Sequence, residues 1–275
     1  MSSLDELRKK SSIITSQNNN SLSSLSRKEK SLDDRINFLA KKNIKNASIE
    51  LKKNTAEIIF IIDKSGSCQG LEHSTIKGIN DLIKNERKNC YPTKMTLILF
   101  DSICETVYDR QDIRKTYDFT YSASGGTALY DAIVKNLYSI KDRQLKIGDV
   151  DPNKTIVAIM TDGDDNESRY LQSDARKCIS DCKKIGWKFI FLGSYSNAKM
   201  VASSLGIDDD MTENYVNNTS GILSNFSSIN RALMDVRETG KVSKNWSDTI
   251  KNNNRETNYK YLEVNKKKVL RLGGK

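Results

Sequence analysis

Short apolar runs alternate with longer amphipathic segments through the middle of the chain. The runs are rich in β-branched residues, which is typical of strands that are buried on both faces. They predict strands at residues 56–62, 95–100, 103–108, 155–160 and 187–192. Apolar residues three and four positions apart predict helices at residues 71–88, 127–146, 170–186, 197–205 and 222–237.

Strands that alternate with helices predict right-handed crossovers and a mostly parallel sheet covered on both faces. Only Asp101 and Ser102 separate the second and third strands, so we expect a hairpin that supplies one antiparallel edge strand. The predicted fold class is therefore α/β, with a Rossmann-like, doubly wound sheet. In such sheets ligands bind at the carboxyl ends of the strands, where the strand order reverses.

The two ends of the chain differ from this middle part. We expect a basic, partly disordered extension at residues 1–54, a domain at 55–240 and a basic tail at 241–275. Residues 1–30 are rich in Ser, Asn and Lys and can bury little apolar surface. An apolar stripe predicts an amphipathic helix at about residues 32–53. This helix either packs on the main domain or offers its stripe to a partner.

The net charge of +10 belongs to the ends of the chain. Residues 1–54 hold 12 Lys or Arg and 6 Asp or Glu, and residues 241–275 hold 10 and 3, so the middle part carries −3. Basic ends can bind nucleic acid or another anionic partner, or they can simply keep a chain soluble. Few aromatic residues are interleaved with the basic ones, which disfavours a single-strand binder.

Composition restricts the location and the chemistry. No apolar run reaches 18 residues, so we expect no membrane span, and the start MSSLDELRKK has no apolar core typical of a secretory signal. The five cysteines include no CxxC pair, which favours reduced thiols and a cytoplasmic location. His73 is the only histidine, which excludes zinc sites with several His ligands.

Three polar loops follow predicted strands or open a predicted helix. One follows the first strand, one opens the helix at 127–146 after a glycine pair, and one follows the strand at 155–160. They present hydroxyl and carboxylate oxygens at Asp63, Ser65, Ser67, Thr127 and Asp162. Hard oxygen donors favour Mg²⁺, Mn²⁺ or Ca²⁺ over softer metals. We predict a divalent cation site made of these five residues, with Mg²⁺ as the expected ion.

The set DxSxS, T and TDG resembles the metal-ion-dependent adhesion site (MIDAS) of von Willebrand factor A domains. Asp63, Ser65 and Ser67 match the first loop of that family, Thr127 the second and Asp162 the third. The resemblance covers roughly residues 55–237, and the segment FIFLGSYSNAKMVASSLGI resembles A domains of bacterial and phage proteins. It implies a binding function in which an acidic residue of a partner protein completes the metal coordination.

The donor set also favours binding over catalysis. Two carboxylates at most neutralise a divalent ion, and hydroxyls are weak donors, so the ion stays electrophilic and accepts an external carboxylate. The three loops contain no His, and the chain has neither a GxxxxGK nor a GxSxG motif. We therefore expect no catalytic residues and a non-enzymatic role.

Two alternatives stay open. An aspartate after the first strand and another later in the chain resemble haloacid-dehalogenase-type phosphatases, which are Mg-dependent phosphohydrolases, but Ser65 stands where that family has a second Asp. A scaffold acting through its basic ends is the other alternative. The final LRLGGK resembles the end of ubiquitin-like proteins, although nothing else in the chain does. The acidic residues Asp164, Asp165 and Glu167 either assist the metal or form a solvated loop.

Overall fold

The computed structural model describes residues 30, 34–47, 50, 54–89, 91–194 and 197–272, with side chains up to residue 262. The chain divides into two compact units, Met1–Leu51 and Lys52–Lys275. In the first unit a helix runs through residues 34–47, and its Ile36, Leu39 and Ile44 side chains are exposed. The disorder expected for residues 1–30 falls almost wholly outside the described residues, as do parts of the helix predicted at 32–53.

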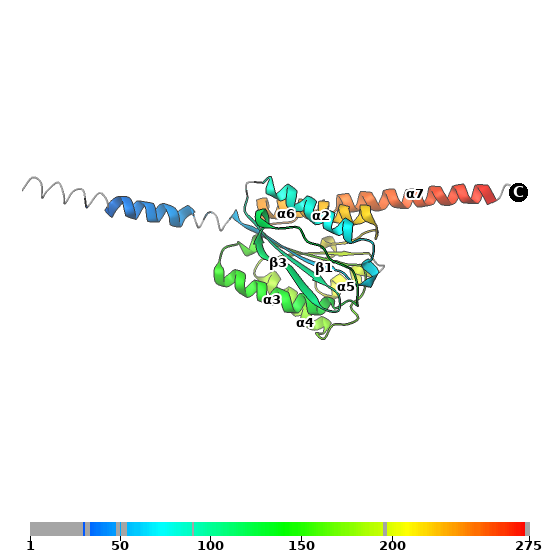
Figure 1. Cartoon of the computed structure of the whole chain (residues 1–275), viewed down its shortest axis with the longest axis horizontal. Helices are drawn as coiled ribbons and strands as arrows, with labels where there is room; N and C mark the ends of the chain where they lie inside the picture. Colours follow the sequence, from blue (N-terminus) through cyan, green and yellow to red (C-terminus); the bar gives the residue numbers. More distant parts are fainter. Residues whose placement is uncertain are drawn as a thin grey trace, which may run out of the picture. The chain divides into compact units, whose positions relative to one another are not determined.

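The second unit is built on one six-stranded sheet with the order β3-β2-β1-β4-β5-β6 (Figure 1). The strands are β1 (Ala56–Asp63), β2 (Thr93–Phe100), β3 (Cys104–Asp112), β4 (Thr155–Thr161), β5 (Lys188–Gly193) and β6 (Thr212–Asn214). All neighbours are parallel except β2 and β3, which form the antiparallel edge. The predicted fold class is confirmed.

Helices cover both faces of the sheet (Figure 1). They are α2 (Glu72–Arg87), α3 (Leu129–Ile147), α4 (Gln172–Lys184), α5 (Ala198–Ser204), α6 (Thr219–Thr239) and α7 (Asp248–Leu272). Apolar residues of α2 and α6 form one core with Phe60 and Ala158, whereas those of α3, α4 and α5 form a second core with Ile61 and Ile159. Neighbouring strand residues thus face opposite cores, which explains why the central strands are apolar throughout.

The strand order reverses between β1 and β4, the two central strands. Their parallel register pairs Ile62 with Met160, so Asp63 and Asp162 lie at the carboxyl ends of adjacent strands. A crevice at such a reversal is the usual ligand-binding position of a doubly wound sheet.

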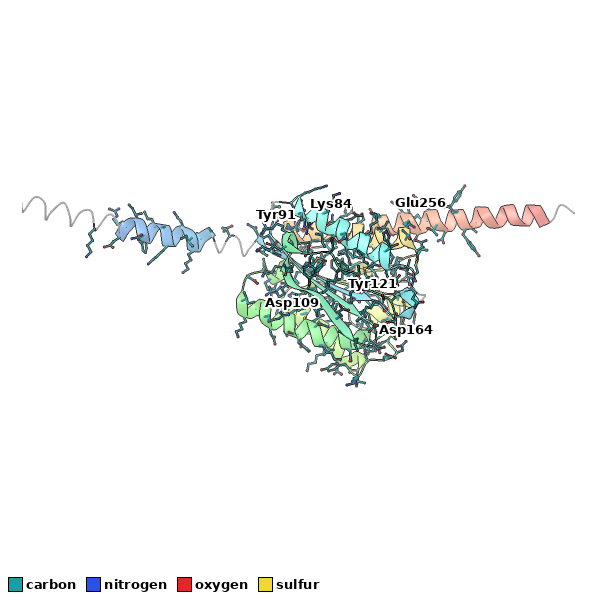
Figure 2. All side chains as sticks on the ribbon, viewed as in Figure 1. Lys84, Tyr91, Asp109, Tyr121, Asp164 and Glu256 are labelled. Carbon is teal, nitrogen blue, oxygen red and sulfur yellow. The ribbon has the colours of Figure 1, made fainter. Side chains whose placement is uncertain are left out.

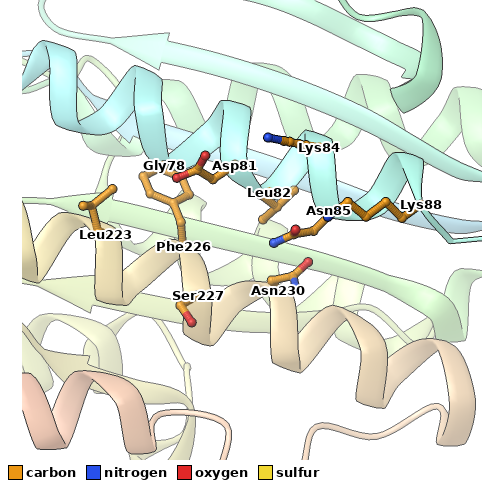
Figure 3. A pocket seen from close by; sticks show the side chains of 10 residues that line it. All are labelled: Gly78, Asp81, Leu82, Lys84, Asn85, Lys88, Leu223, Phe226, Ser227 and Asn230. Carbon is orange, nitrogen blue, oxygen red and sulfur yellow. The ribbon is translucent and has the colours of Figure 1, made fainter.

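Close packing against α6 fixes the position of α2, the helix that follows the loop after β1. A Cβ atom on Gly78 would lie only 2.1 Å from the nearest carbon of the Phe226 ring, so the ring lies directly against the α2 backbone. Figure 3 shows these two residues in a groove between the helices, with Lys84, Lys88 and Asn230 along it. Gly78 therefore allows an approach that any larger residue would prevent.

The structure contains two elements that the sequence pattern did not predict. The short edge strand β6 is polar, and α7 lies where we predicted only a basic tail after residue 240. Trp246 and Ile250 are buried in the core beside α6, so the packed chain continues past residue 240. None of the helices in the described residues has the length and apolar character needed to cross a membrane.

Candidate metal centre

Asp63 is the most buried carboxylate of the candidate site, with 3% of its surface exposed. Its Oδ1 accepts a hydrogen bond from the Ser65 backbone N–H at 2.8 Å, and its Oδ2 accepts one from Thr161 Oγ1 at 2.6 Å. Burial raises the pKa of Asp63, although these hydrogen bonds oppose the shift. A buried carboxylate whose charge is disfavoured is the kind of group that a bound cation would stabilise.

Hydrogen bonds also link the hydroxyls of the first loop to the second carboxylate. Ser65 Oγ lies 3.1 Å from Ser67 Oγ, and Ser67 Oγ donates to Asp162 Oδ1 at 2.6 Å. Asn217 Nδ2 donates to the other oxygen of Asp162 at 3.1 Å. Residues from the loops after β1 and β4 therefore converge on one point.

Thr127 approaches this point from the loop before α3. Its backbone N–H donates to Asn166 Oδ1 at 2.8 Å, and its carbonyl accepts from the Asn166 N–H at 2.9 Å. Its Oγ1 lies 3.8 Å from where a Cβ on Gly163 would be, beside Asp162. Because Thr127 is engaged with the loop after β4, α3 begins at Leu129 and not at residue 127 as predicted.

A buried ion pair holds the base of the first loop. Lys64 Nζ lies 2.8 Å from Asp101 Oδ2, and both side chains are about nine-tenths buried. The Lys64 N–H donates to the Phe100 carbonyl at 2.7 Å, and the Ser124 N–H donates to the Lys64 carbonyl at 2.8 Å. Asp101 thus neutralises Lys64, the residue that follows Asp63, so this lysine does not offset the charge of the Asp63 and Asp162 carboxylates.

Hydrogen bonds from neighbouring elements hold the acidic loop after β4. Asp165 Oδ2 accepts from the Tyr130 N–H at 3.1 Å, and Asn197 Nδ2 donates to both oxygens of Asp164 at 3.1–3.2 Å. Asp164 lies at the opposite end of the domain from Tyr91, which precedes β2 (Figure 2). Asp164 and Asp165 thus have structural partners, so we give neither a role as a ligand.

Sequence reasoning missed two residues at this centre. Thr161 belongs to the TDG motif, which does not indicate that its hydroxyl orients Asp63. The cysteine pattern indicates only a reduced thiol at Cys68. Its Sγ, an oxygen of Asp63 and an oxygen of Asp162 all lie within 4.8 Å of one another, which makes them a possible metal-binding group within the described residues. Its position immediately after the DxSxS loop was the available signal for Cys68.

The fold of this chain is similar to that of several solved structures. No family model matches the sequence, and no curated protein matches it. Among solved structures, the proximal thread matrix protein 1 of the mussel byssus, described with a zinc-occupied MIDAS motif, is 15% identical, with a TM-score of 0.45 over 66% of this chain and 48% of that one. The ArnB paralog VWA2 from Sulfolobus acidocaldarius is 18% identical, with a TM-score of 0.43 over 66% and 44%.

A third similar structure is the manganese-loaded TRAP protein of Plasmodium vivax, at 16% identity and a TM-score of 0.42 over 63% of this chain and 72% of that one. The chain spans about half the length of the mussel and Sulfolobus chains that it matches. At these identities and scores the likeness concerns the outline of the fold alone.

Proposed function

We propose that the sheet domain, whose core extends from Ala56 to Ile250, is a von Willebrand A-type domain that holds one divalent cation and uses it to bind a protein partner. Asp63, Ser65, Ser67, Thr127 and Asp162 would hold the ion, and Mg²⁺ is the ion that their oxygen atoms favour. The observation that carries the proposal is the convergence of Asp63 and Asp162, with the two serine hydroxyls, at the point where the strand order reverses.

The charge balance of the site supports binding of a carboxylate. Two carboxylates would offset the charge of a divalent ion, and Lys64 is already paired with Asp101. The hydroxyls of Ser65, Ser67 and Thr127 are neutral donors. An ion held in this way keeps its attraction for one further anionic oxygen, which the Asp or Glu of a partner protein supplies.

The proposal treats the site as non-enzymatic. The chain's single histidine, His73, is exposed on α2 and lies in none of the three loops. Ser65 occupies the place where a phosphatase of the alternative class carries its second aspartate, and here its N–H supports Asp63. Hydrolysis of a phosphate ester by the Mg²⁺-loaded protein, abolished by Asp63→Asn, would contradict this part of the proposal.

The test is selection from a peptide library displayed in Mg²⁺ and, in parallel, in EDTA. We expect peptides with a shared Asp or Glu to be enriched by the wild type in Mg²⁺ only, and to be lost with Asp63→Ala. Asp208→Ala is a matched control, because Asp208 is an exposed aspartate whose partner is Lys183. Enrichment that is indifferent both to EDTA and to Asp63→Ala would refute metal-dependent binding.

A further inference from the structure

Cys68 places a sulfur atom beside the two carboxylates of the candidate centre. It ends the short 3-10 turn Gly66–Cys68, in which its N–H donates to the Ser65 carbonyl at 3.0 Å. This turn directs the half-buried side chain toward the site, where its Sγ lies within 4.8 Å of oxygens of Asp63 and Asp162. Burial and the neighbouring carboxylates of Asp63 and Asp162 raise the pKa of the Cys68 thiol, so the thiol is protonated in the metal-free protein.

The space next to the sulfur is partly empty. A cavity of about 20 Å³ is lined by the polar groups of Asp63, Cys68, Thr161 and Asn217, together with apolar residues of the neighbouring core. A volume of at least ~10–15 Å³ holds one water molecule, provided that polar groups surround it. The cavity can therefore take a single water beside the thiol without displacing a side chain.

We propose that Cys68 is a further ligand of the ion held by Asp63 and Asp162, and that its sulfur lets this site bind Zn²⁺ as well as the Mg²⁺ that its oxygen atoms favour. The inference rests on the proposed function, because it requires a cation at this point. Thiolate sulfur suits zinc, whereas Mg²⁺ takes oxygen ligands and binds sulfur poorly. On binding, the thiol proton would pass to solvent as the sulfur–metal bond forms.

The distances allow this coordination after a small closure. Around a tetrahedral zinc ion, typical Zn–S and Zn–O bond lengths place a sulfur and an oxygen ligand about 3.6 Å apart. The three candidate atoms lie within 4.8 Å of one another, so a closure of up to about an ångström brings them into range. Three protein ligands leave one position of a tetrahedral zinc ion open, and the partner's carboxylate would occupy it.

The chain offers a matched control thiol. Cys104, at the start of β3, is also half-buried, and it belongs to no such group of ligands in the described part of the chain. Cys178 and Cys182 are fully buried in the core on α4, so replacing them would test packing instead. Cys104→Ser therefore removes a comparable thiol without touching the proposed site.

Cobalt is the probe, because Co²⁺ takes zinc sites and gives a sulfur-to-metal charge-transfer band in the near ultraviolet when a thiolate is bound. We expect this band in the wild type and in Cys104→Ser, and its loss in Cys68→Ser and Cys68→Ala. We also expect both Cys68 variants to lose at least about tenfold in Zn²⁺ affinity by competition titration, while Mn²⁺ binding measured by electron paramagnetic resonance stays within twofold. Retained Mn²⁺ binding shows that the variants are folded.

Two results would overturn the inference, and they are distinguishable. If the Co²⁺ complex of the wild type lacks the band while Mn²⁺ binding still depends on Asp63, the ion is held by oxygens alone and only the role of Cys68 fails. If no divalent metal binds in a manner that depends on Asp63, the proposed function fails as well.

Discussion

Ser67 Oγ donates a hydrogen bond of 2.6 Å to Asp162 Oδ1 and so joins the loops after β1 and β4 across 95 positions of sequence. A hydroxyl and a carboxylate from adjacent strands meet because the parallel register of β1 and β4 brings their carboxyl ends together. In the cation-bound protein that we propose, Ser67 Oγ and Asp162 Oδ1 would both coordinate the ion. The hydrogen bond between them thus marks where the ion would lie.

Thr161→Val tests whether orientation of Asp63 matters for metal binding. The substitution keeps the β-branched shape that suits β4 but removes the donor to Asp63 Oδ2. Loss of a partner that orients a metal ligand typically lowers affinity about 10–100-fold, and we expect a loss of that size by calorimetric titration. Thr155→Val, at the other end of the same strand, should leave metal affinity unchanged. Equal affinities of the two variants would show that Thr161 does not position Asp63 for metal.

The raised pKa of Asp63, caused mainly by burial, predicts a pH dependence of stability in the metal-free protein. The folded state binds the Asp63 proton more tightly than the unfolded state, so the charge destabilises the fold above the raised pKa. This penalty decreases as the pH falls through the raised pKa and is lost below the pKa of the unfolded state. At pH 7 in EDTA, Asp63→Asn should therefore be more stable than the wild type. The difference should shrink on acidification.

Urea unfolding at pH 7 and near pH 4 measures this difference. Saturating divalent metal should reverse the order at pH 7, because only the wild type gains binding free energy. A wild type that is more stable than Asp63→Asn at pH 7 without metal would contradict a destabilising charge at this position.

A buried network at the other end of the sheet should dominate the stability of the domain. Arg110, with a left-handed φ of 47°, makes hydrogen bonds of 2.8 and 3.0 Å to Glu57, and their side chains are 5% and 0% exposed. Arg110→Met leaves Glu57 buried without its cation and should cost about 3–5 kcal/mol of unfolding free energy.

Arg143→Met is the control for that prediction. Arg143 pairs with Asp109 at 2.6 Å, but the two side chains are 41% and 50% exposed, so its loss should cost only about 0–1 kcal/mol. Denaturant titration of both variants gives the comparison. Similar losses of unfolding free energy in the two variants would mean that the burial of Glu57 does not determine the effect of losing Arg110.

The sequence predicted the sheet well because its central strands are apolar on both faces and each ends at a polar loop. It did not predict β6, whose three residues Thr212–Asn214 are polar and pair only with β5. It also did not predict α7, because polar Asn253, Asn254 and Thr257 follow Ile250 at helical spacing and dilute the apolar stripe.

For the site, strand-end positions led to the prediction that five residues share one metal centre. They could not show which atoms pair. That Thr161 supports Asp63, or that Lys64 is neutralised by Asp101, depends on contacts between residues 98 and 37 positions apart. Such contacts follow from strand order and loop geometry, which spacing along one sequence does not specify. The thiol of Cys68 was not predicted, because the motif that indicates the site contains only oxygen donors.

Calorimetric titration of the metal-free protein with Mg²⁺, Mn²⁺ and Zn²⁺, run beside Asp63→Asn, tests the central claim most directly. The account predicts one site per chain in the wild type. It predicts at least about a 100-fold loss of affinity in Asp63→Asn, since removing a ligand should cost no less than removing a residue that only supports one. Near-ultraviolet circular dichroism should show that the variant is folded. Absence of binding by the wild type, or equal binding by a folded Asp63→Asn, would contradict a metal centre between β1 and β4.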